Sequence, residues 1–364
     1  MAKLSVAIMT GGGDAPGLNA VIRAVVKHGV TELGWRVVGI EDSLDGLLET
    51  PRRVRELRRE DVRGILRLGG TILGTTNRGD PFAWKPDGNG GGDRSGEVAA
   101  SLKDVECDGL IAIGGDGTMA ICARLHKEAG IPIVGVPKTI DNDIPGTDIT
   151  FGFDTAAAFA TEAVDRLHAT AEAHDRVMVV EVMGRDAGHI ALQAAMAGGA
   201  DVCLIPEVPF RWEPVVAKIR RRKAYRRHFS VIVVAEGAAP VGEGPIMTTA
   251  PGSNRPHHGG IGQRVAEEIA ERAKVEARAT VLGHLQRGGN PSAFDRVLAT
   301  KLGSHAVELV EEGRWGRMVA AVEGRITSIP LDAILDAPPR TVELLGSGVR
   351  AARGMAIVFG DEGA

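Results

Sequence analysis

The sequence predicts an α/β protein with two doubly wound α/β domains, mainly parallel sheets and an active site in the cleft between the domains. Three observations lead to this prediction. Short apolar runs bounded by glycine are typical of strands buried on both faces. These runs alternate with amphipathic helical patterns, and the alternation occurs twice along the chain. The length of 364 residues is sufficient for two domains of about 100–200 residues each.

The first alternation predicts a domain at residues 1–152. Its expected strands are 3–9, 35–40, 109–113 and 131–136, and its expected helices are 18–33 and one that begins near Thr118. Each strand is short enough to cross a sheet once, and each helix carries an apolar face.

The second alternation predicts a domain at residues 153–284. Strands are expected at 177–182, 201–205 and 229–235, and helices from Gly188 and from Glu213. Two long helices, at 154–173 and after Ala293, carry one apolar face each and are assigned to the core. Residues 285–364 are expected to supply helices and strands that complete both domains.

Composition excludes several classes of function. The net charge is −4 and aromatic residues make up 4%, which disfavours a nucleic-acid binder, a membrane-surface binder and base stacking. The three cysteines have no metal-ligand spacing, so we expect reduced, partly buried thiols. No secretory segment and no apolar run of about 18 residues is present, which leads us to expect a cytoplasmic protein.

Two glycine-rich turns follow predicted strands and precede helices, namely TGGGDAPG at 10–17 and GGDGT at 114–118. Backbone N–H groups and a helix N-terminus make such turns suitable for phosphate. The first is not a dinucleotide fingerprint, because Pro16 occupies the third glycine position, and a tight strand-to-helix turn is its alternative interpretation. Two such turns on one sheet favour a phosphate-rich ligand at the carboxyl ends of the strands.

Carboxylates and a lysine accompany these turns. Asp116 beside phosphates indicates an intervening Mg²⁺, unless it caps the following helix. In the segment PKTIDND, Lys138 offers positive charge to a phosphate in transfer. Asp141 and Asp143 lie two apart, so in an extended segment they would point the same way, one toward a metal ion and the other toward an attacking hydroxyl. The alternative is a polar turn.

The second half of the chain carries cations at corresponding positions. Four arginines, at 176, 185, 278 and 287, lie near strand ends or glycine turns, together with Glu236 and His284. Arginine binds phosphate through its planar fork, and Glu236 could accept hydrogen bonds from sugar hydroxyls. Each arginine taken alone is more readily explained as a surface ion pair. Together they favour a phosphorylated, hydroxyl-bearing acceptor.

Other segments are ambiguous. The loops at 79–96 and 238–260 are either functional lids or mobile insertions, and His257 with His258 in the second could bind a metal ion. Basic stretches at 52–63 and 220–227 are either solvated helix faces or a regulatory anion site.

Eight segments occur in the order GGGDAPGLNAVIRAVV, GGTILG, IGGDGT, PKTIDNDIPGTD, FGFDTA, EVMGRDAG, VAEGA and RATVLGHLQRGGNPSAFDR. Over nearly the whole chain, this pattern resembles the phosphofructokinase A family, in the branch where ATP-dependent and pyrophosphate-dependent members are mixed. GGDGT alone also resembles NAD kinases and lipid kinases. TIDND, MGR and GHxQRGG together are specific.

The resemblance implies a glycolytic 6-phosphofructokinase, which transfers the γ-phosphoryl group of ATP directly to the C1 hydroxyl of fructose 6-phosphate. It implies Mg²⁺ as cofactor, bound at Asp116, and a homotetramer in which some arginines reach into a neighbouring subunit. The implied catalytic residues are Asp141, as general base, with Thr139, Asp143 and Arg185. The implied donor-binding residues are Gly13, Arg78, Gly115, Asp116, Gly117, Thr118 and Lys138. The implied substrate-binding residues are Thr139, Asp141, Arg176, Met183, Gly184, Arg185, Glu236, Arg278, His284 and Arg287.

The choice of donor depends on Gly117 and Lys138. The resemblance implies Asp and Lys at these positions in pyrophosphate users, and Gly at both in ATP-specific members, so this chain has a mixed pair. A carboxylate at 117 would crowd and repel the α-phosphate of ATP, and glycine leaves the position open, which favours ATP. Arg78 is displaced by one position from the usual family arginine. His189 and Lys27 also depart from the family pattern.

Four alternatives remain. Two are a pyrophosphate-dependent fructose-6-phosphate 1-phosphotransferase and a kinase for another sugar phosphate, such as a seven-carbon ketose. A third, from a different class, is a non-catalytic sugar-phosphate or nucleotide sensor. The joint presence of Asp116, Asp141 and Asp143 counts against a sensor, because sensing needs neither a base nor a metal ligand. Pro16 disfavours a dinucleotide oxidoreductase.

Overall fold

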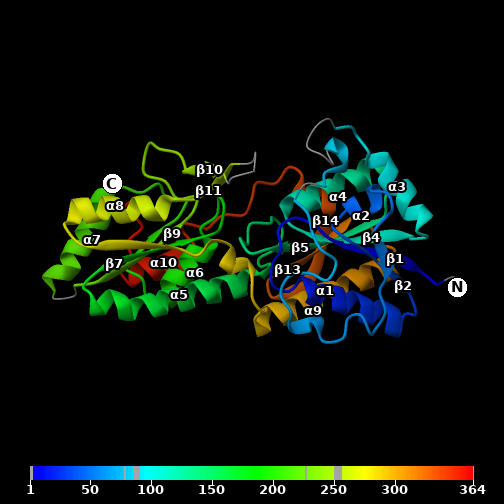
Figure 1. Ribbon diagram of the computed structural model, residues 1–364, viewed down its shortest axis with the longest axis horizontal. Coiled ribbons are helices and arrows are strands. Elements are labelled where there is room, and N and C mark those ends of the chain that lie inside the picture. The colour runs from blue at the N-terminus through cyan, green and yellow to red at the C-terminus, as the bar shows by residue number, and fades with distance from the viewer. Residues whose placement is uncertain (1–2, 78, 85–90, 226–227, 250–255, 364) are drawn as a thin grey trace. The chain divides into compact units, whose positions relative to one another are not determined.

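The computed structural model describes residues 3–77, 79–84, 91–225, 228–249 and 256–363 (Figure 1). The chain divides into two compact units. Unit 1 comprises Met1–Thr139, Asp143–Asp154 and Arg287–Pro339, and unit 2 comprises Ile140–Asn142, Thr155–Gln286 and Arg340–Ala364.

Unit 1 contains an eight-stranded sheet in the order β14-β13-β5-β4-β1-β2-β3, with β6 paired to β5. The strands are β1 Ser5–Thr10, β2 Arg36–Ile40, β3 Val54–Glu56, β4 Gly109–Gly114, β5 Ile133–Thr139, β6 Phe151–Gly152, β13 Arg317–Val322 and β14 Arg325–Pro330. Only β3 and β14 pair antiparallel to their neighbours, and all other pairings are parallel.

Helices cover both faces of this sheet (Figure 1). One face packs on α1 Leu18–Val26 and α9 Ala293–Glu311, and the other on α2 Asp45–Leu48, α3 Ser95–Asp104 and α4 Asp116–Ala129. Along β1, Val6 and Ile8 belong to the first core and Ala7 and Met9 to the second. Both sides of the strand are therefore apolar, as in a doubly wound fold.

Unit 2 contains an entirely parallel sheet in the order β12-β7-β9-β8. Its strands are β7 Val177–Val182, β8 Val202–Leu204, β9 Ser230–Ala235 and β12 Ala277–Val281. The helices α7 Trp212–Ala224 and α8 Ile261–Ala273 pack on one face. Figure 1 shows α5 Phe153–Ala173, α6 His189–Ala197 and α10 Ser347–Gly354 on the other. A hairpin, β10 Met247–Thr249 and β11 Pro256–His258, lies outside the sheet.

The predicted fold class is confirmed, with small shifts at element ends. The predicted helix 18–33 is α1 continued by a π-helical segment, Lys27–Glu32, and the strand predicted at 131–136 runs over Ile133–Thr139. The prediction missed the antiparallel edge strands β3 and β14, whose sequences VRE and RITSIP have no continuous apolar run. These strands have few or no buried side chains, so the buried-strand criterion does not detect them.

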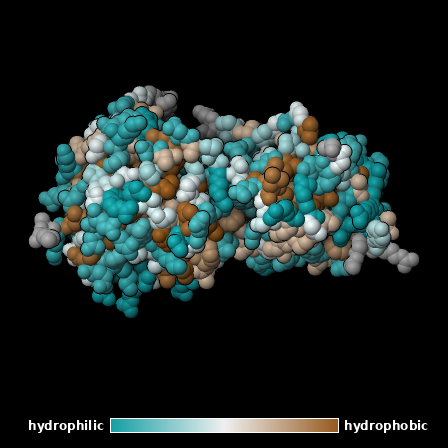
Figure 2. Space-filling view, turned by 180° about the vertical axis from the view of Figure 1, so that it is seen from behind, coloured by the Kyte–Doolittle hydropathy of each residue, from teal (hydrophilic) through white to brown (hydrophobic). Residues whose placement is uncertain are grey.

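The polar surface and the buried cysteines are consistent with apolar side chains gathered in the interior. Figure 2 shows one face on which hydrophilic side chains predominate and apolar ones are scattered in small groups. Cys107, Cys122 and Cys203 are free and buried, and burial raises the pKa of the Cys122 thiol to about 12. No helix in the described ranges is long and apolar enough to cross a membrane.

The α2 helix contains a carboxyl group, that of Asp45, whose ionisation destabilises the folded protein. Asp45 Oδ1 is buried and has no hydrogen-bond partner among the described residues. Burial, then repulsion from Glu49, raises the Asp45 pKa from 3.8 to about 6. Because the folded pKa lies above the unfolded one, the cost of ionisation is absent below pH 3.8, grows toward pH 6 and is complete above it.

We therefore expect Asp45→Asn to raise Tm at pH 8 by about 2–4 °C, with the gain disappearing toward pH 4. Thermal unfolding followed by circular dichroism at several pH values measures this. Asp165→Asn, at an exposed position of α5, is the control and should change Tm little at any pH. An equal gain at pH 4 and pH 8 would contradict the electrostatic cause.

Candidate active site

The glycine turn after β1 is held between the end of β4 and the segment 74–76. Gly11 N donates to Ile113 O at 2.8 Å, and Gly12 N donates to Thr76 O at 3.0 Å. The Thr75 hydroxyl donates to Gly12 O at 2.6 Å. Hydrogen bonds of the backbone groups of the turn therefore hold its conformation.

The second glycine turn touches the first through Thr118. A Cβ atom at Gly11 would lie 2.9 Å from Thr118 Oγ1, and one at Gly114 would lie 2.3 Å from Thr118 Cβ. Glycine at both positions leaves the room that Thr118 occupies. Gly115 is the N-cap of the 14-residue helix α4, and Asp116 is its first residue. The positive end of the helix dipole therefore lies at this turn.

Two cations bind the carbonyl groups of the first turn. Lys138, which is 3% exposed, donates from Nζ to Gly13 O. Arg287 Nη1 donates to Asp14 O at 3.1 Å, and a Cβ atom at Gly13 would lie 2.8 Å from that nitrogen. The structure therefore brings Arg287 to the donor-type residues of unit 1, although the sequence grouped it with the acceptor cations. Arg78 lies outside the described residues.

The segment after β5 carries two buried carboxylates. Asp141 is 3% and Asp143 is 7% exposed, and Thr139 ends β5. The expectation of an extended segment is wrong, because the chain bends at Ile140 and Asp141 and Asn142 has a φ of 56°. Asparagine is among the few residues that adopt this left-handed conformation readily. The alternation argument for Asp141 and Asp143 therefore does not apply.

In unit 2, Glu236 organises the loop that follows β7. Gly184 N and Arg185 N both donate to Glu236 Oε1, at 3.2 and 3.0 Å. Arg185 is exposed, with a φ of 51°. The structure thus brings Gly184, Arg185 and Glu236 together at the carboxyl edge of the sheet. His284 is exposed in the 3₁₀ turn Gly283–Arg287, which follows β12.

Arg176 and Arg278 lie at the opposite, amino edge of the same sheet. Arg176 Nε is 2.9 Å from Glu276 Oε2, and Arg278 Nη2 is 2.7 Å from Glu276 Oε1. The hydrogen bond from Arg176 lowers the pKa of Glu276. β7 has six residues, which at about 3.3 Å each separates the two edges by roughly 20 Å. Within one chain, these two arginines are therefore far from Glu236.

Sequence reasoning missed two buried amides that hold loops in place. Asn19, 2% exposed, donates to Leu68 O and Gly69 O and accepts from Ile72 N. Gln286, 1% exposed, accepts from Met183 N at 2.9 Å. A polar residue inside the apolar helix LNAVIRAVV was the available signal for Asn19, and the GHxQRGG motif was the signal for Gln286.

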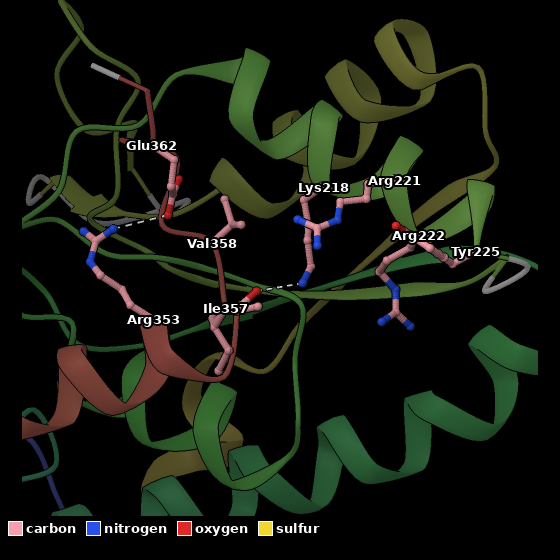
Figure 3. Close-up of a pocket in the computed structure, with 9 residues that line it drawn as sticks. Lys218, Arg221, Arg222, Tyr225, Arg353, Ile357, Val358 and Glu362 are labelled. Atoms are coloured by element: carbon pink, nitrogen blue, oxygen red, sulfur yellow. Dashed lines mark hydrogen bonds and ion pairs between the residues drawn. The ribbon is translucent and has the colours of Figure 1, made fainter.

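A basic cavity of about 450 Å³ lies elsewhere in unit 2 (Figure 3). Its charged lining residues are Lys218, Arg221, Arg222, Arg353 and Glu362. Part of this charge is neutralised, because Arg222 pairs with Asp201 at 2.7 Å and Arg353 with Glu362 at 3.3 Å. None of the residues predicted for catalysis or binding lines it. The basic stretch at 220–227 thus supplies part of the cavity, and residues 226 and 227 are not described.

The ambiguous histidines have protein partners. His257 contacts the Thr248 hydroxyl at 3.1 Å, and His258 Nε2 is 3.2 Å from Asp186 Oδ1. Among the described residues, no group of three or more His, Cys, Asp or Glu side chains is arranged to hold a metal ion. Residues 85–90 and 250–255 of the two long loops are outside the described ranges.

The contact of Gln286 leads to a prediction about stability. We expect Gln286→Leu to lower the free energy of unfolding by about 1–3 kcal/mol, because the buried Met183 N–H loses its acceptor. Urea unfolding measures this. Gln263→Leu removes an exposed contact with Glu267 and should have little effect. Equal losses for the two variants would show that the Met183 contact contributes nothing specific.

Comparison with known proteins gives a consistent result. The family described as Phosphofructokinase matches residues 5–310. The chain is 47% identical to ATP-dependent 6-phosphofructokinase 1 of Synechocystis, covering 98% of each chain. It is 51% identical to the pyrophosphate–fructose 6-phosphate 1-phosphotransferase of Amycolatopsis methanolica, covering 87% of this chain and 90% of the relative. The phosphofructokinase structure of Pichia pastoris matches with a TM-score of 0.80 and 32% identity, covering 98% of this chain and 37% of that one. These matches agree with the two α/β sheets and the glycine turns, and the chain belongs to the phosphofructokinase family.

Proposed function

We propose that this chain is an ATP-dependent 6-phosphofructokinase of glycolysis, which converts fructose 6-phosphate to fructose 1,6-bisphosphate. One observation carries the proposal. Two glycine turns and the buried Lys138 meet at the carboxyl edge of the unit 1 sheet, directly before the segment that contains Asp141. This arrangement suits a phosphoryl donor beside a buried general base.

Asp141 is the general base of the reaction. It accepts the proton of the C1 hydroxyl while the C1 oxygen bonds to the γ-phosphorus and the bond to the leaving ADP breaks. Thr139 and Asp143 flank it and belong to the same catalytic group, and Arg185 neutralises charge on the transferred group.

The donor phosphates lie along the two glycine turns. Gly13, Gly115, Gly117 and Thr118 offer backbone and hydroxyl groups, Lys138 and Arg78 offer positive charge, and the N-terminus of α4 favours the anion. Asp116 begins α4 and is exposed. A single carboxylate fits Mg²⁺, which is usually held by one or two carboxylates and by substrate phosphates. When bound, Mg²⁺ would neutralise charge on the donor phosphates.

The sugar phosphate lies along the carboxyl edge of unit 2. Met183, Gly184, Arg185, Glu236 and His284 lie at this edge. Arg287 lies on the first glycine turn of unit 1, and it is kept as a substrate-binding residue on the family pattern alone. Arg176 and Arg278 lie at the opposite edge of the unit 2 sheet, so we propose that they serve the site of a neighbouring subunit in a homotetramer. A cytoplasmic location is part of this proposal, because the proposed substrates are those of glycolysis.

The structural basis for choosing ATP is the space at Gly117. A Cβ atom there would meet nothing within 4 Å, so the protein leaves room for a side chain to begin at this position. The charge of an aspartate there, beside Asp116, would oppose the α-phosphate of ATP. Because an ATP-dependent and a pyrophosphate-dependent relative are almost equally similar to this chain, overall identity does not distinguish the donors, and Lys138 is compatible with both.

The first test measures phosphoryl transfer to fructose 6-phosphate with Mg²⁺, using ATP and pyrophosphate in parallel. We expect turnover with ATP, and we expect Asp141→Asn to lower kcat by about 10²–10⁴-fold with fructose 6-phosphate binding retained. Asp165→Asn on the exposed surface of α5 should leave kcat unchanged. Binding of both substrates without turnover in the wild type would favour a sensor, and turnover with pyrophosphate alone would favour the second enzyme.

Donor choice is tested separately at position 117. We expect Gly117→Asp to lower kcat/KM for ATP at least about tenfold, with a smaller loss or a gain for pyrophosphate. Gly117→Ala fills the same open space without charge and should retain ATP use. If Gly117→Asp and Gly117→Ala behave alike with ATP, charge at this position does not select the donor.

A further inference from the structure

The short segment that contains Asp141 is packed by residues distant in the sequence. Ile140–Asn142 belongs to unit 2, whereas Thr139 and Asp143 on either side belong to unit 1. Ile140, Asp141 and Asn142 are all buried. Arg340 Nη1 donates to the Asn142 carbonyl at 3.2 Å, across 198 positions of sequence.

That carbonyl belongs to the peptide between Asn142 and Asp143, one residue beyond the general base Asp141. Asn142 has a φ of 56°, a left-handed conformation that asparagine tolerates, but that its surroundings must still select over the commoner right-handed and extended conformations. A hydrogen bond from a guanidinium group to this carbonyl restricts rotation of the peptide plane. The orientation of the turn therefore depends on Arg340.

The backbone around Arg340 is itself held firmly. Glu207 accepts from Val342 N at 2.7 Å and from Gly188 N at 2.9 and 3.1 Å. Gly188 is the N-cap of α6, and a Cβ atom there would lie 2.5 Å from Ile205 Cβ. One carboxylate thus joins the segment 340–342 to the start of a helix in the core of unit 2.

His189, the first residue of α6, gives a second support. Its ring hydrogen-bonds to the Arg340 backbone, and burial, then the positive charge of Arg340, lowers the His189 pKa to about 4. The imidazole is therefore neutral near pH 7 and adds no repulsion to the Arg340 guanidinium. The backbone at Arg340 is thus held both by the contacts of Glu207 next to it and by His189.

We propose that Arg340 is a positioning residue for phosphoryl transfer. It holds the Asn142 carbonyl and so fixes the turn that aims Asp141 at the attacking hydroxyl. The inference rests on the proposed function, in which Asp141 is the general base. Arg340 is not assigned a contact with either substrate.

The test uses Arg340→Met, which keeps the apolar stem and removes the donor. A misplaced catalytic group costs up to about 10²-fold in rate, so we expect kcat to fall by about 10–100-fold. KM for ATP and for fructose 6-phosphate should change less than about twofold, because binding groups stay in place. Arg340→Lys should recover part of kcat, since lysine donates to the carbonyl without the planar fork.

Arg211→Met is the matched control. Arg211 also donates from a guanidinium nitrogen to a backbone carbonyl in unit 2, that of Asp361, at 3.0 Å. Within the described part of the chain, Arg211 donates to Asp361 O and Gly360 O and makes no hydrogen bond to the segment 140–142. Its loss should leave kcat within about twofold of the wild type, because distant sites that share no partner act independently.

A double-mutant cycle with Asp141→Asn separates positioning from general stability. Once the base is removed, adding Arg340→Met should lower the residual kcat by less than about twofold. An undiminished loss in that background, or a kcat for Arg340→Met within twofold of the wild type, would overturn the inference. If Asp141→Asn itself keeps full activity, the assignment of the base fails instead. Should Arg340→Met not fold, the split between kcat and KM for Arg340→Lys decides.

Discussion

The contact between Lys138 and the first glycine turn is the constraint on which the rest of unit 1 depends. A buried ammonium group needs oxygen partners, and the Gly13 carbonyl is one of them. This contact ties the end of β5 to the turn after β1. Thr118 packs between Gly11 of the first glycine turn and Gly114 at the end of β4. Because the three strands are adjacent and parallel, their carboxyl ends meet at one edge. The two glycine turns, Lys138 and the N-terminus of α4 are thereby arranged at this edge by contacts of the protein itself.

Unit 2 uses a different device at its carboxyl edge. Glu236 accepts from two successive backbone amides, so a single carboxylate shapes the loop of Gly184 and Arg185. Gln286 holds the preceding residue, Met183, in the same way. Exposed Arg185 thus projects from a backbone that is fixed by buried or half-buried acceptors. In the function proposed above, such support lowers the entropy lost when Arg185 binds a phosphate group.

Much of the fold and the site could be predicted because it is encoded locally. Strand β1, helix α1 and the turn between them are visible as an apolar run, a glycine cluster and a 3.6-residue pattern within residues 3–33. The segment 139–143 was misjudged because the left-handed conformation of Asn142 depends on its environment, and two-residue alternation assumes extended backbone. The edge strand β14 was missed because only one of its six side chains is fully buried.

The sequence by itself determined the chemical inventory: two glycine turns, a lysine, the buried aspartates and the arginines, in an order that predicts parallel strands. Only the tertiary structure decided which of them meet. It placed Arg287 on the first glycine turn, separated Arg176 and Arg278 from Glu236, and brought Arg340 to Asn142. The physical reason is that periodicity and turn chemistry act over a few residues. Contacts across 198 or 273 positions instead depend on strand order and register, which local patterns do not specify.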